Sequence, residues 1–218
     1  MPDEDEFQFN YAIQSRQWDI LLNLIRNKAV PVDTFTWRTR EQSPSTALMC
    51  AITMNAPSHV IVSLINLTER FKADINQTNP DGDNALSVAA KNDLASCIVA
   101  LLKHGAFSIS CIFDAVNKEN ISALTVLLRG VHNVPSSKFD VNSTDSFGRT
   151  PLHYACMYGY SDVCRLLLEF GADPLKRDTD RKSSVDYADE IAASNIDKTD
   201  VRRFIYDVIE SHNLNPYQ

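Results

Sequence analysis

The sequence is poor in the residues and motifs on which many enzymes depend. It has only six glycines, and it contains neither G-x-x-x-x-G-K-S/T nor G-x-G-x-x-G, the loops that hold phosphate groups. The G-x-S-x-G elbow that carries the nucleophile of many hydrolases is also missing. No apolar run approaches the ~18 residues of a membrane-spanning helix, so we expect no membrane insertion. The chain therefore lacks the common signatures of nucleotide binding and of serine hydrolysis.

Positive charge is scarce as well. Lys and Arg total 21 against 28 Asp and Glu, which gives a net charge of −7. A chain that binds nucleic acid usually carries a basic stripe, and none is evident, so we expect no direct contact with nucleic acid. The basic residues between Lys176 and Lys182 are flanked by Asp173, Asp178 and Asp180 and are expected to form a solvated face.

Cysteine occurs five times, but never as a C-x-x-C pair. The first residues, MPDEDEF, are acidic, and no apolar signal segment follows them. Unpaired cysteines without a secretory signal indicate a reducing compartment, so we expect an intracellular protein, cytoplasmic or nuclear or both. With 44% hydrophobic and 22% charged residues, the composition is typical of a globular chain, and we expect a single domain over residues 1–218.

One short motif recurs along the whole chain. The alanine that ends TPLHYA has counterparts in SSVDYA, NALSVA, TALMCA and SCIFDA, and a looser one in FQFNYA. These alanines are Ala12, Ala51, Ala89, Ala115, Ala155 and Ala188. An apolar pair such as Leu167-Leu168 follows twelve and thirteen residues later in most copies. A repeat of this length predicts stacked supersecondary units.

Helix signals explain the recurring pattern. Thr150 is suited to an N-cap, and Pro151 then occupies the first helical position, where its missing N–H does no harm. A small alanine allows two helices to approach closely. Gly159 is expected to end the first helix, and Gly171 to end the second in the left-handed region. One such pair cannot bury its own apolar faces, so several must stack.

The stretch DSFGRTPLHYACMYGYSDVCRLLLEFGADP resembles an ankyrin repeat with the T-P-L-H-x-A signature intact, and GDNALSVAAKNDLASCIVALLKHGAF resembles a degraded copy. The resemblance implies an all-α ankyrin-repeat solenoid of about six helix-turn-helix units, irregular in length, with short β-hairpin-like loops. The expected units are residues 5–33, 40–74, 75–107, 108–140, 141–174 and 175–210.

The unit lengths depart from the family pattern in several places. The short interval before Ala115 predicts that the hairpin of the fourth unit is almost absent. Longer intervals predict loops at Asn27–Ser45, Leu67–Asp83 and Gly130–Gly148, where repeat scaffolds often carry function. The acidic residues 3–6 are expected to precede the first helix and favour its N-terminus. An inserted segment, Asp189–Asp200, has no clear place in the pattern.

His153, Cys156 and Cys164 could form a zinc or nucleophile cluster, or they could be framework residues. The framework interpretation is favoured, because His153 fills the histidine position of the signature and the cysteines fill small apolar positions. A structural zinc site needs four ligands in closely spaced pairs. We therefore expect neither metal, nor cofactor, nor catalysis. Asn79-Pro80-Asp81-Gly82 lacks the acids of a calcium loop and is predicted to be a turn.

Partner contacts are expected where the framework leaves positions free, at hairpin tips and on the outward side of first helices. The residues concerned are Ser146, Phe147, Arg149, Met157 and Tyr158 in the fifth unit, Asp81 and Asp83 in the third, and Trp37 and Arg38 in the loop before the second. Aromatic residues, Met and Arg are enriched at interface centres. Two alternatives stay open: Phe147 or Tyr158 packs on a neighbouring hairpin, and Trp37 packs inward.

The resemblance implies a non-catalytic module that binds a partner protein through its hairpin tips and concave inner-helix surface. It would act as an adaptor, inhibitor or regulator, without a small-molecule substrate, and as a monomer when free. Two narrower alternatives are an inhibitor of an NF-kappaB-type transcription factor and a host-directed effector. Metal or thiol chemistry at His153, Cys156 and Cys164 is the remaining alternative.

Overall fold

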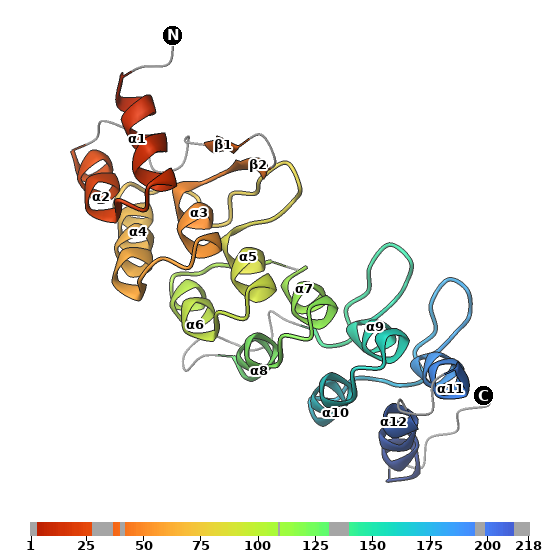
Figure 1. Cartoon of the computed structure of the whole chain (residues 1–218). Helices are drawn as coiled ribbons and strands as arrows, with labels where there is room; N and C mark the ends of the chain where they lie inside the picture. The colour runs from red at the N-terminus through yellow and green to blue at the C-terminus, as the bar shows by residue number, and fades with distance from the viewer. Residues whose placement is uncertain are drawn as a thin grey trace. The chain divides into compact units, whose positions relative to one another are not determined.

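The computed structural model describes residues 4–27, 37–39, 42–108, 110–130, 140–194 and 199–211. Within these ranges the chain forms twelve helices and one two-stranded antiparallel sheet (Figure 1). The helices are α1 (Glu4–Gln14), α2 (Trp18–Arg26), α3 (Ala47–Thr53), α4 (Ser58–Arg70), α5 (Ala85–Lys91), α6 (Ala95–Lys103), α7 (Cys111–Asn117), α8 (Ile121–Arg129), α9 (Pro151–Tyr158), α10 (Ser161–Glu169), α11 (Ser184–Ser194) and α12 (Thr199–Ser211). The strands are β1 (Trp37–Thr39) and β2 (Gln42–Ser45). The helices follow one another in six pairs, which fits the expected all-α fold of about six helix-turn-helix units.

The helices form two compact units, and the first contains α1 to α6. Within it, first helices pack on first helices, α1 on α3 and α3 on α5, and second helices pack on second helices, α2 on α4 and α4 on α6. Ala12, Ala51 and Ala89 are fully buried. The repeated alanine is therefore part of the buried packing between helices, as its small size allows.

The second unit contains α7 to α12. In it α9 packs on α11, and α10 packs on both α8 and α12. Ala115, Ala155 and Ala188 are fully buried, as is Leu167 from the repeated apolar pair. The same packing rule therefore operates in both units.

The predicted helix ends of the fifth repeat are confirmed. Thr150 is the N-cap of α9 with extended backbone, and Pro151 occupies the first turn. Gly159 is the C-cap in the left-handed region, at φ 69° and ψ 36°. Gly171 follows the end of α10 with φ 82°. These signals fix α9 and α10 between loops that carry the candidate site.

Two expected boundaries, a loop start and a helix start, differ from the observed ones. Helix α4 continues to Arg70, so part of the loop predicted at Leu67–Asp83 is helical; Leu67 and Thr68 are buried, and burial extends the helix. Helix α1 begins at Glu4, so part of the acidic run lies inside its first turn. Of the inserted segment Asp189–Asp200, residues 189–194 belong to α11 and residues 199–200 to α12, and residues 195–198 lie outside the described ranges. Asp189 joins α11 to α12 through an ion pair with Arg202 at 2.6 Å. The connection between α6 and α7 is short, residues 104–110, as predicted.

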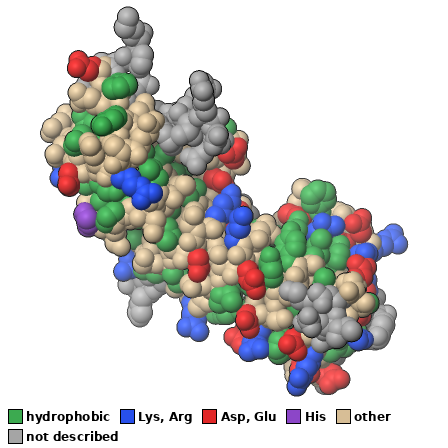
Figure 2. All heavy atoms as spheres, viewed as in Figure 1, with side chains coloured by type: hydrophobic (Ala, Val, Ile, Leu, Met, Phe, Trp, Pro, Cys, Tyr) green, Lys and Arg blue, Asp and Glu red, His purple; other side chains and the backbone are tan. Residues whose placement is uncertain are grey.

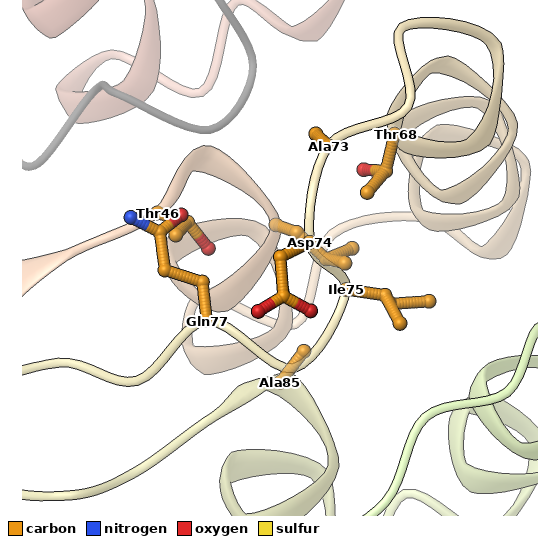
Figure 3. A pocket seen from close by; sticks show the side chains of 8 residues that line it. Thr46, Thr68, Ala73, Asp74, Ile75, Gln77 and Ala85 are labelled. Carbon is orange, nitrogen blue, oxygen red and sulfur yellow. The ribbon is translucent and has the colours of Figure 1, made fainter.

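A small cavity in the first unit lies among α3, α4, the loop before α5 and the start of α5 (Figure 3). Its volume is about 10 Å³, and Gln77 extends across it from the loop towards Thr46 at the start of α3. A space of this size holds a single water and no larger ligand.

No helix among the described residues is long and apolar enough to cross a bilayer.

Candidate functional site

One aspartate, Asp145, holds the loop before α9 in a turn through hydrogen bonds. Asp145 Oδ1 accepts hydrogen bonds from the backbone N–H of Phe147 at 2.8 Å and of Arg149 at 3.0 Å. The backbone of Asp145 also pairs with Arg149, at 3.0 Å, and with Gly148, at 3.1 Å. This network fixes a tight turn and directs Ser146 and Phe147 to its exposed tip.

The turn predicted at residues 79–82 has the same construction. Asn79 Oδ1 accepts from the backbone N–H of Asp81 at 3.0 Å and of Asp83 at 2.8 Å. Asp81 is exposed at the tip, whereas Asp83 forms an ion pair with Lys91 on α5 at 2.6 Å. Of the two predicted contact residues, Asp83 is therefore engaged within the fold, and Asp81 faces solvent.

The loop before α11 repeats the design around Asp178. Its Oδ1 accepts from the backbone N–H groups of Asp180 and Lys182 at 2.9 and 3.0 Å, and its Oδ2 accepts from the Tyr187 hydroxyl at 2.7 Å. Desolvation opposes the charge of this buried side chain, but these hydrogen bonds and one from Arg149 outweigh it and lower the pKa of Asp178. Asp178 therefore anchors the loop before α11, and it was not among the residues predicted from the sequence.

A sequence signal for this anchor exists. A tyrosine follows the loop aspartate by nine residues in two successive repeats, as Asp145 and Tyr154 and as Asp178 and Tyr187. In both pairs the hydroxyl donates to the carboxylate, at 2.5 and 2.7 Å. The spacing therefore marks a turn that is tied to its own first helix.

Arg149 joins the two loops of the second unit. Its Nε lies 3.3 Å from Asp178 Oδ2, and its Nη2 lies 3.6 Å from Asp180 Oδ2. The guanidinium also lies 5.5 Å from the Phe147 ring centre and 5.8 Å from that of Tyr187. Desolvation disfavours the charged form, but interactions with Asp178, Tyr154 and Tyr187 together outweigh it, so the pKa of Arg149 is raised. Only 21% of the side chain is exposed.

A run of aromatic side chains covers α9 and its flanks. Tyr154 lies 6.1 Å from Phe113 and 6.2 Å from Tyr158, and Tyr158 lies 5.4 Å from Tyr160, between ring centres. Tyr158 is 43% exposed and Phe147 is 56% exposed. Hydrophobic side chains accordingly gather over α9 and at the tip of the loop before it (Figure 2). Both residues present apolar surface to solvent even though each contacts a neighbouring side chain.

Met157 lies beside Tyr158 near the end of α9 and is partly exposed. Trp37 and Arg38 belong to β1. The predictions for these last two residues concern side chains outside the described part of the structure.

His153 is fully buried, and its ring serves the framework. Nδ1 accepts from the backbone N–H of Thr150 at 3.0 Å, and Nε2 donates to the carbonyl of Lys182 at 3.2 Å. The second bond joins α9 to the loop before α11. Burial lowers the pKa of His153, which favours the neutral ring.

Cys156 and Cys164 face each other between α9 and α10, with their sulfur atoms 3.8 Å apart. Both are fully buried, and burial raises the pKa of Cys156 well above its ordinary value. Within the described ranges, no three side chains of metal-ligating type come together. The buried positions of these cysteines fit small hydrophobic framework residues.

Comparison with known proteins agrees with this arrangement. The family model for the ankyrin repeat matches residues 147–179. The crystal structure of EF0377, an ankyrin repeat protein, is 21% identical with a TM-score of 0.73, over 91% of this chain and 96% of that one. The ankyrin repeat domain of Bcl-3, described as a member of the IkappaB family, is 20% identical with a TM-score of 0.70, over 92% and 85%.

The ankyrin repeat protein FPV244 of fowlpox virus is 28% identical over 201 residues, which cover 85% of this chain. The chain spans 27% of the length of that protein, and between 4 and 12% of three further curated relatives. The stacked helix pairs, the intact signature in the fifth repeat and these matches show that the chain is an ankyrin repeat protein.

Proposed function

We propose that the chain binds a partner protein through the surface made by Ser146, Phe147, Met157 and Tyr158, here called the α9 surface, and acts as an adaptor, inhibitor or regulator. Ankyrin repeats are protein-interaction modules, and the fold is typical of scaffolds without catalysis. The observation that carries the proposal is the exposure of Phe147 and Tyr158 on a fixed framework.

Exposed aromatic side chains of this kind favour association with a protein. Burying an aromatic ring removes a large apolar area from water, and truncation of a central one typically costs about 2 kcal/mol or more of binding free energy. The Asp145 network fixes the tip that carries Phe147, and α9 fixes Tyr158. Little conformational entropy is therefore lost on binding.

Affinity capture followed by titration of the captured protein tests the proposal. The wild-type chain is compared with Phe147→Ala/Tyr158→Ala and with Ile121→Ala, a control that removes an exposed apolar side chain from α8. We expect the double variant to bind at least ~30-fold more weakly, the equivalent of about 2 kcal/mol, and the control to bind like the wild type. Equal binding by all three would show that the α9 surface is not the interface.

The narrower possibility of an inhibitor of NF-kappaB-type factors can be tested with the same variants. The likeness to the Bcl-3 domain concerns the fold, so the α9 surface carries the proposal by itself. Saturable binding of a purified NF-kappaB-type transcription factor, weakened by the double variant, would support this identity of the partner.

A further inference from the structure

We infer that Arg149 is a positioning residue of the α9 surface: it holds the Phe147 ring against the loop before α11 and does not itself contact the partner. The inference rests on the proposed function, since Phe147 is the contact that it presents. It reassigns Arg149, which residue type alone would place among the direct contacts.

The first observation is the placement of the guanidinium. It lies 5.5 Å from the ring centre of Phe147 and 5.8 Å from that of Tyr187. A guanidinium at this distance is attracted to the face of an aromatic ring. Phe147 is thus coupled to a buried tyrosine of the next repeat, although most of its own surface faces solvent.

The second observation is the anchor that fixes the guanidinium. Asp178 is buried, and its carboxylate accepts from two backbone N–H groups and the Tyr187 hydroxyl as well as from Arg149 Nε at 3.3 Å. A buried carboxylate with this many donors has one orientation, so it holds Arg149 in a single position. An arginine fixed in this way has little freedom to turn towards a partner.

The third observation is that the two loop backbones are joined. The backbone N–H of Thr179 donates to the Phe147 carbonyl at 3.0 Å. Gly148 lies so close to the second loop that a Cβ atom there would stand 3.3 Å from Thr179 N. The tip that carries Phe147 is therefore held by its side chain through Arg149 and by its main chain through Thr179. The sixth repeat thus completes the surface of the fifth.

A test that needs no partner measures amide hydrogen exchange at Thr179 by NMR. In Arg149→Gln we expect about tenfold faster exchange at this amide, because local opening becomes easier. The matched control is Lys182→Gln, which removes another cation 5.3 Å from the Tyr187 ring and leaves Arg149 in place; it should exchange like the wild type. Arg149→Lys keeps the charge without the planar group and should exchange at an intermediate rate. Wild-type exchange in Arg149→Gln would overturn the inference.

A double-mutant cycle with the captured partner separates positioning from contact. Arg149→Gln should weaken binding about three- to tenfold in the wild-type background and leave binding unchanged in Phe147→Ala, since the two residues act through one ring. Equal losses in both backgrounds would mean that Arg149 contacts the partner directly and would overturn the inference. If Phe147→Ala/Tyr158→Ala binds normally, the proposed function fails, and the exchange experiment still decides whether Arg149 holds the tip.

Discussion

At the scale of single residues, His153 shows how a signature histidine stabilises the fold. Its Nδ1 accepts from Thr150 N–H, and its Nε2 donates to the Lys182 carbonyl. Protonation of Nδ1 would replace the acceptor by a donor that faces another donor, and burial further disfavours the charge. Both effects agree with a pKa of His153 below the ordinary value of 6.5.

This depressed pKa makes stability depend on pH. The unfolded chain takes up the proton near pH 6.5, and the folded chain only at lower pH, so the contribution of neutral His153 is complete above pH ~6.5 and is lost as the pH falls below it. In urea unfolding at pH 7.5, His153→Gln should be less stable than the wild type by about 1–3 kcal/mol, because buried hydrogen bonds are lost.

The difference between His153→Gln and the wild type should shrink at pH 5.5, since only the wild type carries the titrating ring at this position. Every other side chain is the same in the two proteins, so the comparison isolates position 153. A difference that stays constant from pH 7.5 to 5.5 would argue that the ring is not held in its neutral form.

At the scale of elements, three loop tips share one hydrogen-bond pattern. Asn79, Asp145 and Asp178 each close a turn by accepting two backbone N–H groups. The sequence predicted the turn at Asn79 from its neighbours Pro80 and Gly82. The bond between Arg149 and Asp178 could not be read from the sequence, because the two residues lie 29 positions apart in different repeats.

Gly148 tests how closely the two loops of the second unit are joined. It has φ +70°, and an added Cβ would stand 3.3 Å from Thr179 N and 3.4 Å from Asp178 Cα. Gly148→Ala combines backbone strain with this crowding and should destabilise the chain by about 2–3 kcal/mol. Gly171→Ala is the matched control, because Gly171 has φ +82° and open space around it; it should cost about 1 kcal/mol. If thermal unfolding shows the same loss of stability for both variants, the loop before α11 moves easily enough to accommodate the added Cβ atom.

At the scale of the whole molecule, the fold was readable from the sequence because each repeat is an imperfect copy of the fifth. The intact signature at Thr150–Ala155 located the alanines, and those alanines are all fully buried. The candidate site was less readable. Repeat position and residue type made Phe147 and Tyr158 candidate contacts but left open whether they pack on a neighbouring hairpin. They also could not show that Arg149 is held within the fold, since Asp178 and Tyr187 belong to the following repeat.

The chain as a whole buries all five of its cysteines, and this predicts how its thiols react. Burial raises the pKa of Cys50 and of Cys97 to about 12, and it raises that of Cys156 as well. A protonated and inaccessible thiol is not a nucleophile, so reaction requires local or global opening.

At pH 8 the folded chain should react with a disulfide reagent at least ~100-fold more slowly than a free cysteine peptide, and all five thiols should react in urea. The measurement is the stopped-flow rate of thiolate release at increasing urea concentrations, with the Cys156→Ala/Cys164→Ala variant as the control for this pair. If one thiol of the wild type reacts in the folded state as fast as the peptide, and the double variant lacks that phase, then His153, Cys156 and Cys164 carry thiol chemistry after all.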